Sequence, residues 1–186
     1  MKALARVIGI DDGFFKPRTK MKTYIVGVVF RVDNRIEGII SEKIKVDALD
    51  STEKIISMIS KSKFKPQIKV VLLGGVNFAG FNIIDAEKLY KKLRIPIIIV
   101  FRKKPRMEKI RNALKSFKDF DKRIALIKKA GEIHRANNFF FQCHGIEQKE
   151  AQVILKKCSY HSNLPEPIRL AHLIASGITL GESTRP

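Results

Sequence analysis

The stretch ARVIGIDDGFF, residues 5–15, is an apolar run that ends in two adjacent acids and a glycine. Its centre, residues 6–10, predicts a short buried strand. Asp11 directly follows this strand, which places a carboxylate at the rim of a sheet, where element ends converge on a divalent cation. Asp12-Gly13 is also typical of a tight turn, with Asp11 as its cap. Residue chemistry alone therefore fits a metal site and a simple turn equally well.

The rest of the chain predicts an α/β fold around this strand. Segments 24–32 and 36–46, joined by Asp33-Asn34, predict a hairpin that gives the sheet an antiparallel start. Two fully apolar runs, 70–73 and 95–101, are typical of strands in a parallel sheet. The remaining expected elements are helices at 51–61, 86–93, from 106 onward, 146–158 and 168–180, and a last strand at 139–143. We expect a mixed sheet flanked by helices, in a single domain over residues 1–186.

Composition narrows the class of protein. The chain has 37 Lys and Arg against 18 Asp and Glu, a formal charge of +19. Such a surplus attracts polyanions, of which nucleic acid is the commonest inside cells. There is no long apolar run, no secretory signal pattern and only two cysteines, too few for a disulfide framework. We expect a cytoplasmic protein with a nucleic-acid or nucleotide partner and no membrane partner, in an oligomeric state that the sequence leaves open.

The positive charge is concentrated between residues 102 and 129, which contain twelve Lys or Arg against three acids. Apolar residues recur at helical spacing from Met107 to Phe117, and Ile124 and Ile127 do so in a second segment. On a helix, four of these cations would form a stripe opposite the apolar face, as on a surface that follows a phosphate backbone. The alternative interpretation is a solvated helix face. The residues predicted to bind nucleic acid are Arg102, Lys104, Arg106, Arg111, Lys115, Lys118 and Lys122.

Acids also stand at the ends of other predicted elements. Asp47 and Asp50 follow the third strand, whereas Asp85 and Glu166 stand near helix starts. Taken singly, the last three have a capping or helix-dipole explanation, and Asp50 is followed by an acid three positions later, as in a capping box. Taken together, they match the need of two-metal phosphodiester hydrolysis for carboxylates from separate parts of a fold.

Five stretches in order carry a resemblance to a known family: GIDDG (9–13), KVDALDSTE (45–53), GGVNFAGFNIID (74–85), IPIIIVFRKKP (95–105) and PEPIRLAHLIASGITLGES (165–183). Together they resemble a mostly archaeal family associated with the name endonuclease dU. That family is distantly similar to endonuclease V and, through it, to the ribonuclease H-like superfamily. The resemblance implies a ribonuclease H-like mixed sheet and a DNA-repair endonuclease. Such an enzyme would use Mg²⁺, or alternatively Mn²⁺, to hydrolyse a phosphodiester in DNA at deoxyuridine or another deaminated base.

The resemblance also implies a set of metal ligands. Asp11 matches the acid that ends the first strand of endonuclease V, so it would be a ligand and a catalytic residue. Asp47 is the nearest counterpart of the second acid, with Asp50 as an alternative. Asp85 and Glu166 complete the candidate ligands.

Two further catalytic residues follow from the same resemblance, and one position departs from it. Lys103 would stabilise charge on the phosphate, and His172 would correspond to the histidine of the closing helix. Where endonuclease V has an acid at the end of the fourth strand, this chain has Gly74. That departure keeps a second hypothesis open, a non-catalytic nucleic-acid-binding protein on the same fold, and a third, a phosphate-handling enzyme acting on small nucleotides.

The glycine-rich segment 74–82 lacks the lysine and hydroxyl residue of a phosphate-binding loop and the dinucleotide spacing. It suits a pocket for a flipped base, in which Phe78 and Phe81 stack on the base and Asn77 or Asn82 reads its edge. The alternative is that both phenylalanines belong to the core.

Overall fold

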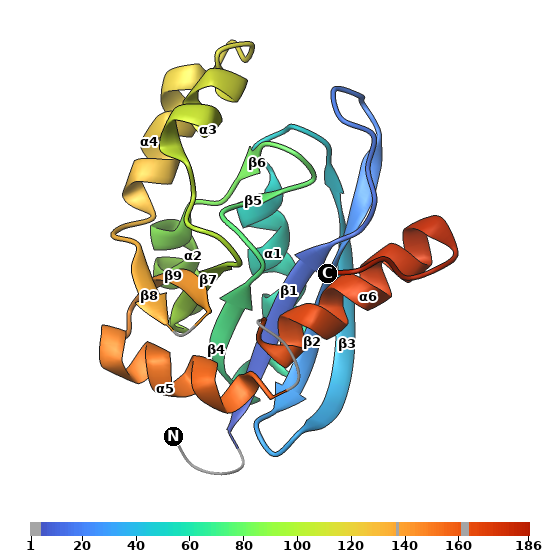
Figure 1. The fold of residues 1–186 in the computed structure, drawn as a ribbon. Coiled ribbons are helices and arrows are strands. Elements are labelled where there is room, and N and C mark those ends of the chain that lie inside the picture. The colour runs from blue at the N-terminus through green and yellow to red at the C-terminus, as the bar shows by residue number, and fades with distance from the viewer. Residues whose placement is uncertain (1–4, 137, 161–163) are drawn as a thin grey trace.

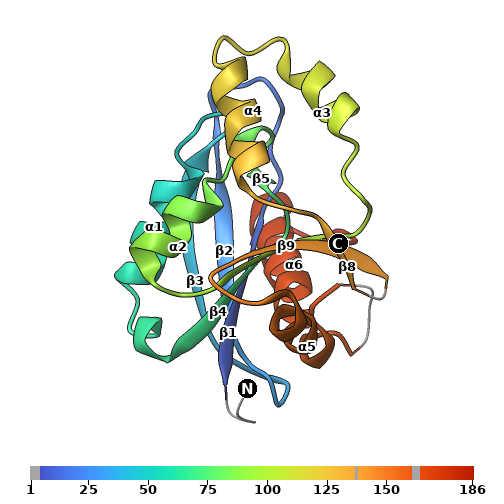
Figure 2. The same cartoon turned by 90° about the vertical axis from the view of Figure 1, so that its left-hand side faces the viewer.

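The chain folds around one mixed sheet with helices on both faces (Figures 1 and 2). The structure is a computed structural model that describes residues 5–136, 138–160 and 164–186. The sheet strands of the described residues are β1 (Arg6–Asp12), β2 (Lys22–Arg31), β3 (Arg35–Lys45), β4 (Ile68–Leu73), β7 (Ile97–Phe101), β8 (His134–Ala136) and β9 (Phe139–His144). They lie in the order β3-β2-β1-β4-β7-β9-β8.

The first strand connects the antiparallel and parallel parts of the sheet. β1 pairs antiparallel with β2 and parallel with β4, and β4 pairs parallel with β7. β2 and β3 form the predicted hairpin, whose turn places Asn34 at a φ of 74°. The predicted α/β class is therefore confirmed. β9 and β8 extend the sheet beyond β7 with antiparallel pairing.

Two hydrophobic cores lie on opposite faces of the sheet. One is covered by α1 (Ser51–Ser60), α2 (Ala86–Leu93), α3 (Met107–Leu114) and α4 (Phe120–Lys129). The other is covered by α5 (Gln148–Cys158) and α6 (Glu166–Leu180), as Figure 2 shows edge-on. Within the described part of the chain, no helix has the length and apolar character needed to cross a membrane.

Alternation along β1 assigns its side chains to the two faces. Val7 packs in the core under α5 and α6, whereas Ile8 and Ile10 pack in the core under α1 and α2. Successive side chains of a strand point to opposite faces. Asp11 therefore continues the α6 face and Asp12 the α1 and α2 face.

The interpretation of Asp12-Gly13 as a tight turn is wrong. β1 continues through Asp12, which pairs with Ile25, and the amide of Gly13 still donates to the carbonyl of Tyr24 at 2.9 Å. The chain turns later, at residues 17–20. The ladder extends because Ile25 and Val26 of β2 continue to pair opposite both acids.

The expected basic stripe on one helix is also corrected, because α3 ends at Leu114 and α4 begins at Phe120. The break occurs where Phe117 turns inward: its ring meets Phe81 edge-on at 5.6 Å and lies 4.4 Å below the guanidinium of Arg123. Packing of Phe117 against a distant loop outweighs the helical propensity of the segment.

A small hairpin and a short helix were not expected. The hairpin is formed by β5 (Asn77–Phe78) and β6 (Asn82–Ile83), and the 3₁₀ helix η1 by Lys65–Gln67. The predicted capping box at Asp50 is wrong, since its side chain makes no cap bond to α1. Asp50 instead accepts a hydrogen bond from Asn82 at 2.6 Å, which joins the hairpin to the start of α1.

Candidate active site

The first pair of the site brings together side chains 161 positions apart. Nδ1 of His172 on α6 lies 3.1 Å from Oδ2 of Asp11 at the end of β1. The helix can approach this closely because β1 has glycine at position 9, where a Cβ would lie 2.3 Å from the carbonyl carbon of Pro167. The bond to Asp11 raises the pKa of His172, while burial and the charge of Arg102 oppose the rise.

Gly74, which directly follows the last residue of β4, stands beside this pair. A Cβ built on Gly74 would lie 2.8 Å from Oδ1 of Asp11 and 3.2 Å from Cγ2 of Ile168. The carboxylate of Asp11 therefore occupies the space that a side chain at Gly74 would need. The glycine that stands here in place of the endonuclease V acid therefore leaves room for the Asp11 carboxylate.

Asp12 supplies a second carboxylate that the sequence interpretation left out. Its Oδ2 accepts a hydrogen bond from the amide of Ala79 in the β5–β6 turn. Burial raises the pKa of the Asp12 carboxyl to about 7, and the adjacent charge of Asp11 adds to the rise. Continuing the alternation of β1 for two more residues would have identified Asp12.

Asp47 lies on the other side of the β5–β6 turn, and its carboxylate accepts hydrogen bonds from backbone amides. Its Oδ1 accepts from the amide of Phe81 and its Oδ2 from the amide of Arg18, each at 2.9 Å. The guanidinium of Arg123, itself buried, donates to the carbonyls of Asp47 at 2.9 Å and Ala48 at 3.2 Å. Both oxygens of the Asp47 carboxylate thus fix the loops around the site.

Asp85 and Glu166 are not brought to Asp11 and Asp12, which corrects the expected grouping. Asp85 caps α2, accepting from the amide of Lys88 at 2.9 Å, and its other oxygen lies 3.4 Å from Nζ of Lys129. Glu166 is buried at the start of α6 and is bound by both arms of the Arg169 guanidinium, at 2.8 and 2.5 Å. Among residues 5–136, 138–160 and 164–186, no three His, Cys, Asp or Glu side chains gather as a metal-ligand set.

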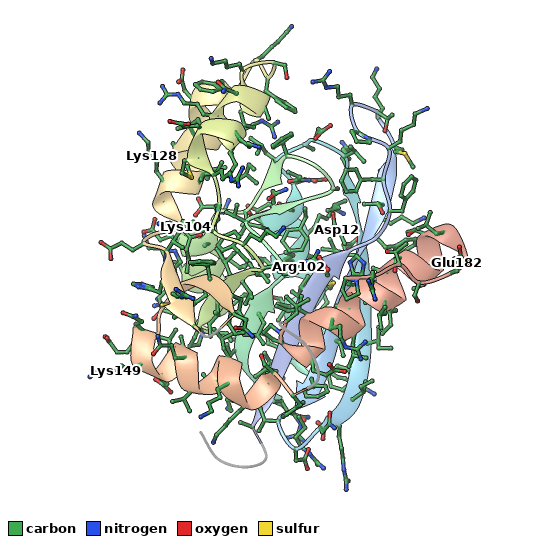
Figure 3. The ribbon with its side chains drawn as sticks, in the orientation of Figure 1. Asp12, Arg102, Lys104, Lys128, Lys149 and Glu182 are labelled. Carbon is green, nitrogen blue, oxygen red and sulfur yellow. The ribbon has the colours of Figure 1, made fainter. Side chains whose placement is uncertain are left out.

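The basic segment after β7 leads away from the two acids. Arg102 is close enough to His172 for its charge to lower the pKa of the imidazole. Lys103, Lys104, Arg106 and Lys109 line an open hollow of about 670 Å³, here called the basic recess. In the view of Figure 3, Asp12, Arg102, Lys104 and Lys128 follow one another across the molecule. The structure thus places Arg102 beside His172 and Lys103 in the recess.

The other predicted nucleic-acid-binding residues lie on the α3–α4 hairpin at the end of the molecule (Figure 1). All four are exposed: Arg111, Lys115, Lys118 and Lys122.

Half of the predicted base pocket lines a real cavity. Asn77 and Phe81 lie in a hollow of about 300 Å³, here called the base pocket, together with the rings of Phe15 and Phe117 and the carboxylate-bearing Asp47. The prediction is wrong for the other two residues. Phe78 is core, only 1% exposed. Asn82 is fully buried and joins the hairpin to its neighbours, accepting from the amide of Ser51 at 3.0 Å.

Sequence comparison connects this geometry to known proteins. The profile of the family described as Endonuclease dU matches residues 3–179. A UPF0215 protein of Methanothermobacter thermautotrophicus is 41% identical over 98% of this chain and 92% of its own length. Another, from Methanopyrus kandleri, is 38% identical over 99% of this chain and 96% of its own.

Two solved structures share the fold. One is the crystal structure of a protein of unknown function from Archaeoglobus fulgidus, with a TM-score of 0.87 and 37% identity over 94% of this chain and 98% of that one. The other is Ciona intestinalis endonuclease V in complex with DNA containing an inosine followed by a ribo-adenosine. Its TM-score is 0.62 at 16% identity, over 92% of this chain and 84% of that one. The architecture is therefore the ribonuclease H-like fold of endonuclease V.

Proposed function

The chain belongs to the endonuclease dU family, and on that premise we propose that it is a Mg²⁺-dependent endonuclease that cleaves DNA beside deoxyuridine or another deaminated base. The observation that carries the proposal is the pair of adjacent carboxylates, Asp11 and Asp12, beside His172 at one end of the sheet. Two acids held next to each other, one with a strongly raised pKa, are typical of functional sites.

The donor set fits a magnesium ion. Mg²⁺ is usually held by one or two carboxylates, with water and substrate phosphate completing its coordination. Asp11 and Asp12 extend toward opposite faces at the end of β1, but their carboxylates are near enough for the charge of Asp11 to raise the pKa of Asp12. A divalent cation at this rim of the sheet would relieve their mutual repulsion. A bound Mg²⁺ would supply charge stabilisation at the phosphate and a more acidic water. We assign it to Asp11 and Asp12, and no longer to Asp47, Asp85 or Glu166.

The surrounding side chains would prepare the substrate. His172 bonds to Asp11 through Nδ1 and lies 3.1 Å from Oγ1 of Thr184 through Nε2, so both ring nitrogens are fixed. Its raised pKa favours the imidazolium, which would offset negative charge at the phosphate. Arg102 would add a second positive charge there, and the basic recess would hold the next part of the backbone.

The base pocket would receive the deaminated base after it leaves the stack. The rings of Phe15, Phe81 and Phe117 offer stacking surfaces, and stacking contributes about 1–3 kcal/mol per base. The side-chain amide of Asn77, which donates to the carbonyl of Gly80 at 2.7 Å, stands at the same hollow and would contact the base edge.

A nicking assay tests the proposal. Duplexes and single strands containing one deoxyuridine or one hypoxanthine are incubated with the protein in Mg²⁺, in Mn²⁺ and in EDTA. We expect nicking only at lesions and only with metal, and loss of nicking in Asp11→Asn. The matched control is Asp33→Asn, since Asp33 lies in the β2–β3 turn, where it pairs with Arg31. Salt-dependent binding without cleavage in any metal would instead support the non-catalytic nucleic-acid-binding protein.

A further inference from the structure

A second cavity adjoins the basic recess and shares Lys104 and Pro105 with it. We propose that this cavity binds an unstacked nucleobase. That nucleobase belongs to the same strand whose deaminated base enters the base pocket. This cavity, here called the Gln142 pocket, has a volume of about 470 Å³. Ligand pockets for small organic groups span roughly 300–1,000 Å³. The inference rests on the proposed function in taking a nucleic-acid strand as the substrate and the base pocket as the place of its deaminated base.

The apolar walls of the Gln142 pocket come from one strand, two helices and the segment before β8. Phe101 ends β7, Met107 and Ile110 belong to α3, Ile127 to α4, and Ile133 precedes β8. Met107 is 40% exposed although it is a large apolar side chain. An aromatic ring among branched aliphatic side chains suits the flat face of a base, because every base has such a face.

One polar side chain opens into this apolar cavity. Gln142 on β9 is only 4% exposed, and its Nε2 donates to the carbonyl of Gly131 at 2.6 Å. Within the described part of the chain, no donor bonds to its Oε1, yet that oxygen is not sealed from solvent. That oxygen is therefore open to a hydrogen-bond donor from the cavity. A base that places an N–H or an amino group in the cavity would donate to it.

The mouth of the Gln142 pocket is charged for a phosphate. Lys104 and Lys128 stand at the rim, and Lys104 is shared with the basic recess. Glu132 is the single acid among the lining residues that the structure describes. A base inside the pocket would thus leave its phosphate at the recess. The apolar walls would contact the base, and the lysines at the rim would contact its phosphate.

The two pockets are neighbours separated by a wall of the protein. The consecutive residues Val76 and Asn77 line one pocket each, and α3 contributes Ile110 to the Gln142 pocket and Ala113 to the base pocket. Two bases in the two pockets would have these side chains between them and so could not stack on each other. Filling both pockets therefore requires a locally unpaired, unstacked strand.

The test uses Asp11→Asn protein, which we expect to bind without cleaving, and a series of single-stranded oligonucleotides with a fixed deoxyuridine. Each oligonucleotide has one abasic residue at a different position near the lesion. We expect binding to weaken about tenfold for an abasic residue at one particular position, and little elsewhere. Equal binding across all positions would overturn the proposal.

Two variants assign the effect to the cavity. Gln142→Leu removes the buried amide, and Met107→Trp fills the mouth from an exposed position, so it does not depend on the core refolding. Either variant should weaken binding to the intact strand and remove the extra loss at the sensitive position. Gln148→Leu, exposed in the first turn of α5, is the matched control. A positional effect that persists in Met107→Trp would contradict the assignment.

Failure of the Gln142 pocket proposal can be distinguished from failure of the endonuclease proposal. If the wild-type protein cleaves nothing but shows the positional effect, the endonuclease proposal fails and the Gln142 pocket stands. If it cleaves at deoxyuridine without any positional effect, the reverse holds.

Discussion

The Asp11 carboxylate occupies the space that a side chain at position 74 would need. This limits which residues can provide carboxylates at the site. A Cβ at position 74 would lie 2.8 Å from the Asp11 carboxylate. An acid at the end of β4 is therefore incompatible with Asp11 as it stands. We infer that the missing acid is replaced in function by Asp12, the next residue on β1.

Gly74→Ala should lower the cleavage rate at least about tenfold with little effect on stability. The added methyl group would displace the Asp11 carboxylate, and position 74 has no positive φ that would make an alanine there otherwise unfavourable. Single-turnover cleavage and thermal unfolding measure the two effects. Gly177→Ala in α6 is the control, since its Cβ would meet only the hydroxyl of Ser183 at 3.2 Å. Full activity in Gly74→Ala would refute the explanation that the Asp11 carboxylate needs this space.

The raised pKa of Asp12 predicts how stability depends on pH in metal-free buffer. Burial raises the pKa of the folded Asp12 carboxyl from its ordinary value of 3.8 to about 7, so the folded state binds more protons between these limits. Stability gained from this group is present near pH 4 and is lost as the pH rises toward 7. Urea unfolding across this range should show wild type losing up to about 4 kcal/mol relative to Asp12→Asn, because each unit of pKa change corresponds to about 1.4 kcal/mol. A pH-independent difference would contradict the burial of Asp12, and Mg²⁺ should reduce the loss.

At the scale of elements, the β5–β6 turn is fixed between the two sides of the site. Asp12 binds the amide of Ala79 and Asp47 binds the amide of Phe81, while the buried Arg123 joins α4 to the same loops. The turn thus connects the carboxylate site to the base pocket. Asp47 acts here through backbone hydrogen bonds.

Asp47→Asn should therefore destabilise the protein without changing its metal requirement. Each hydrogen bond to a charged group contributes about 1.5–3 kcal/mol. We expect a lower unfolding temperature and weaker binding of lesion DNA, with an unchanged Mg²⁺ concentration for half-maximal cleavage. An increased Mg²⁺ requirement would restore Asp47 as a ligand.

Elements with a clear local pattern were predictable from the sequence. The apolar runs at β4 and β7, the hairpin at Asp33-Asn34 and the whole of α2 follow from periodicity and turn chemistry. The two-residue strands β5 and β6 are too short for any period to appear. The α3–α4 break depends on Phe117 meeting Phe81, a contact absent from the local sequence.

The site was predictable only in part for the same reason. Asp11 was a candidate from its place after the first strand, and His172 was named from the resemblance. Their contact spans 161 residues and depends on the close approach of α6 to Gly9. Asp12 was missed because a turn was assigned where β1 continues. Asp85 and Glu166 were grouped with Asp11 by their positions at element ends, although cap and ion-pair contacts fully explain both.

At the scale of the whole molecule, the charge of +19 is organised around the site. Arg102 stands beside His172, the basic recess follows, and the exposed cations of the α3–α4 hairpin lie at the end of the molecule (Figure 1). A strand held at the site would therefore continue over positive surface.

Salt dependence of DNA binding measures which cations meet phosphate. Removing one phosphate contact lowers the slope of log affinity against log salt by about 1. We expect this change for Lys104→Gln in the basic recess and no change for Lys69→Gln, an exposed lysine at the start of β4. Identical slopes for the two variants would contradict the proposed path of the strand.

The most direct test of the carboxylate pair is the single-turnover cleavage rate of deoxyuridine-containing DNA by Asp12→Asn, compared with Asp47→Asn, in saturating Mg²⁺ at a temperature where both are folded. The pairing of Asp12 with Asp11 predicts a rate roughly 100-fold or more below wild type for Asp12→Asn. The rate for Asp47→Asn should stay within about tenfold of wild type, because the Asp47 carboxylate accepts hydrogen bonds from backbone amides. Near-wild-type cleavage by Asp12→Asn together with an inactive Asp47→Asn would contradict it.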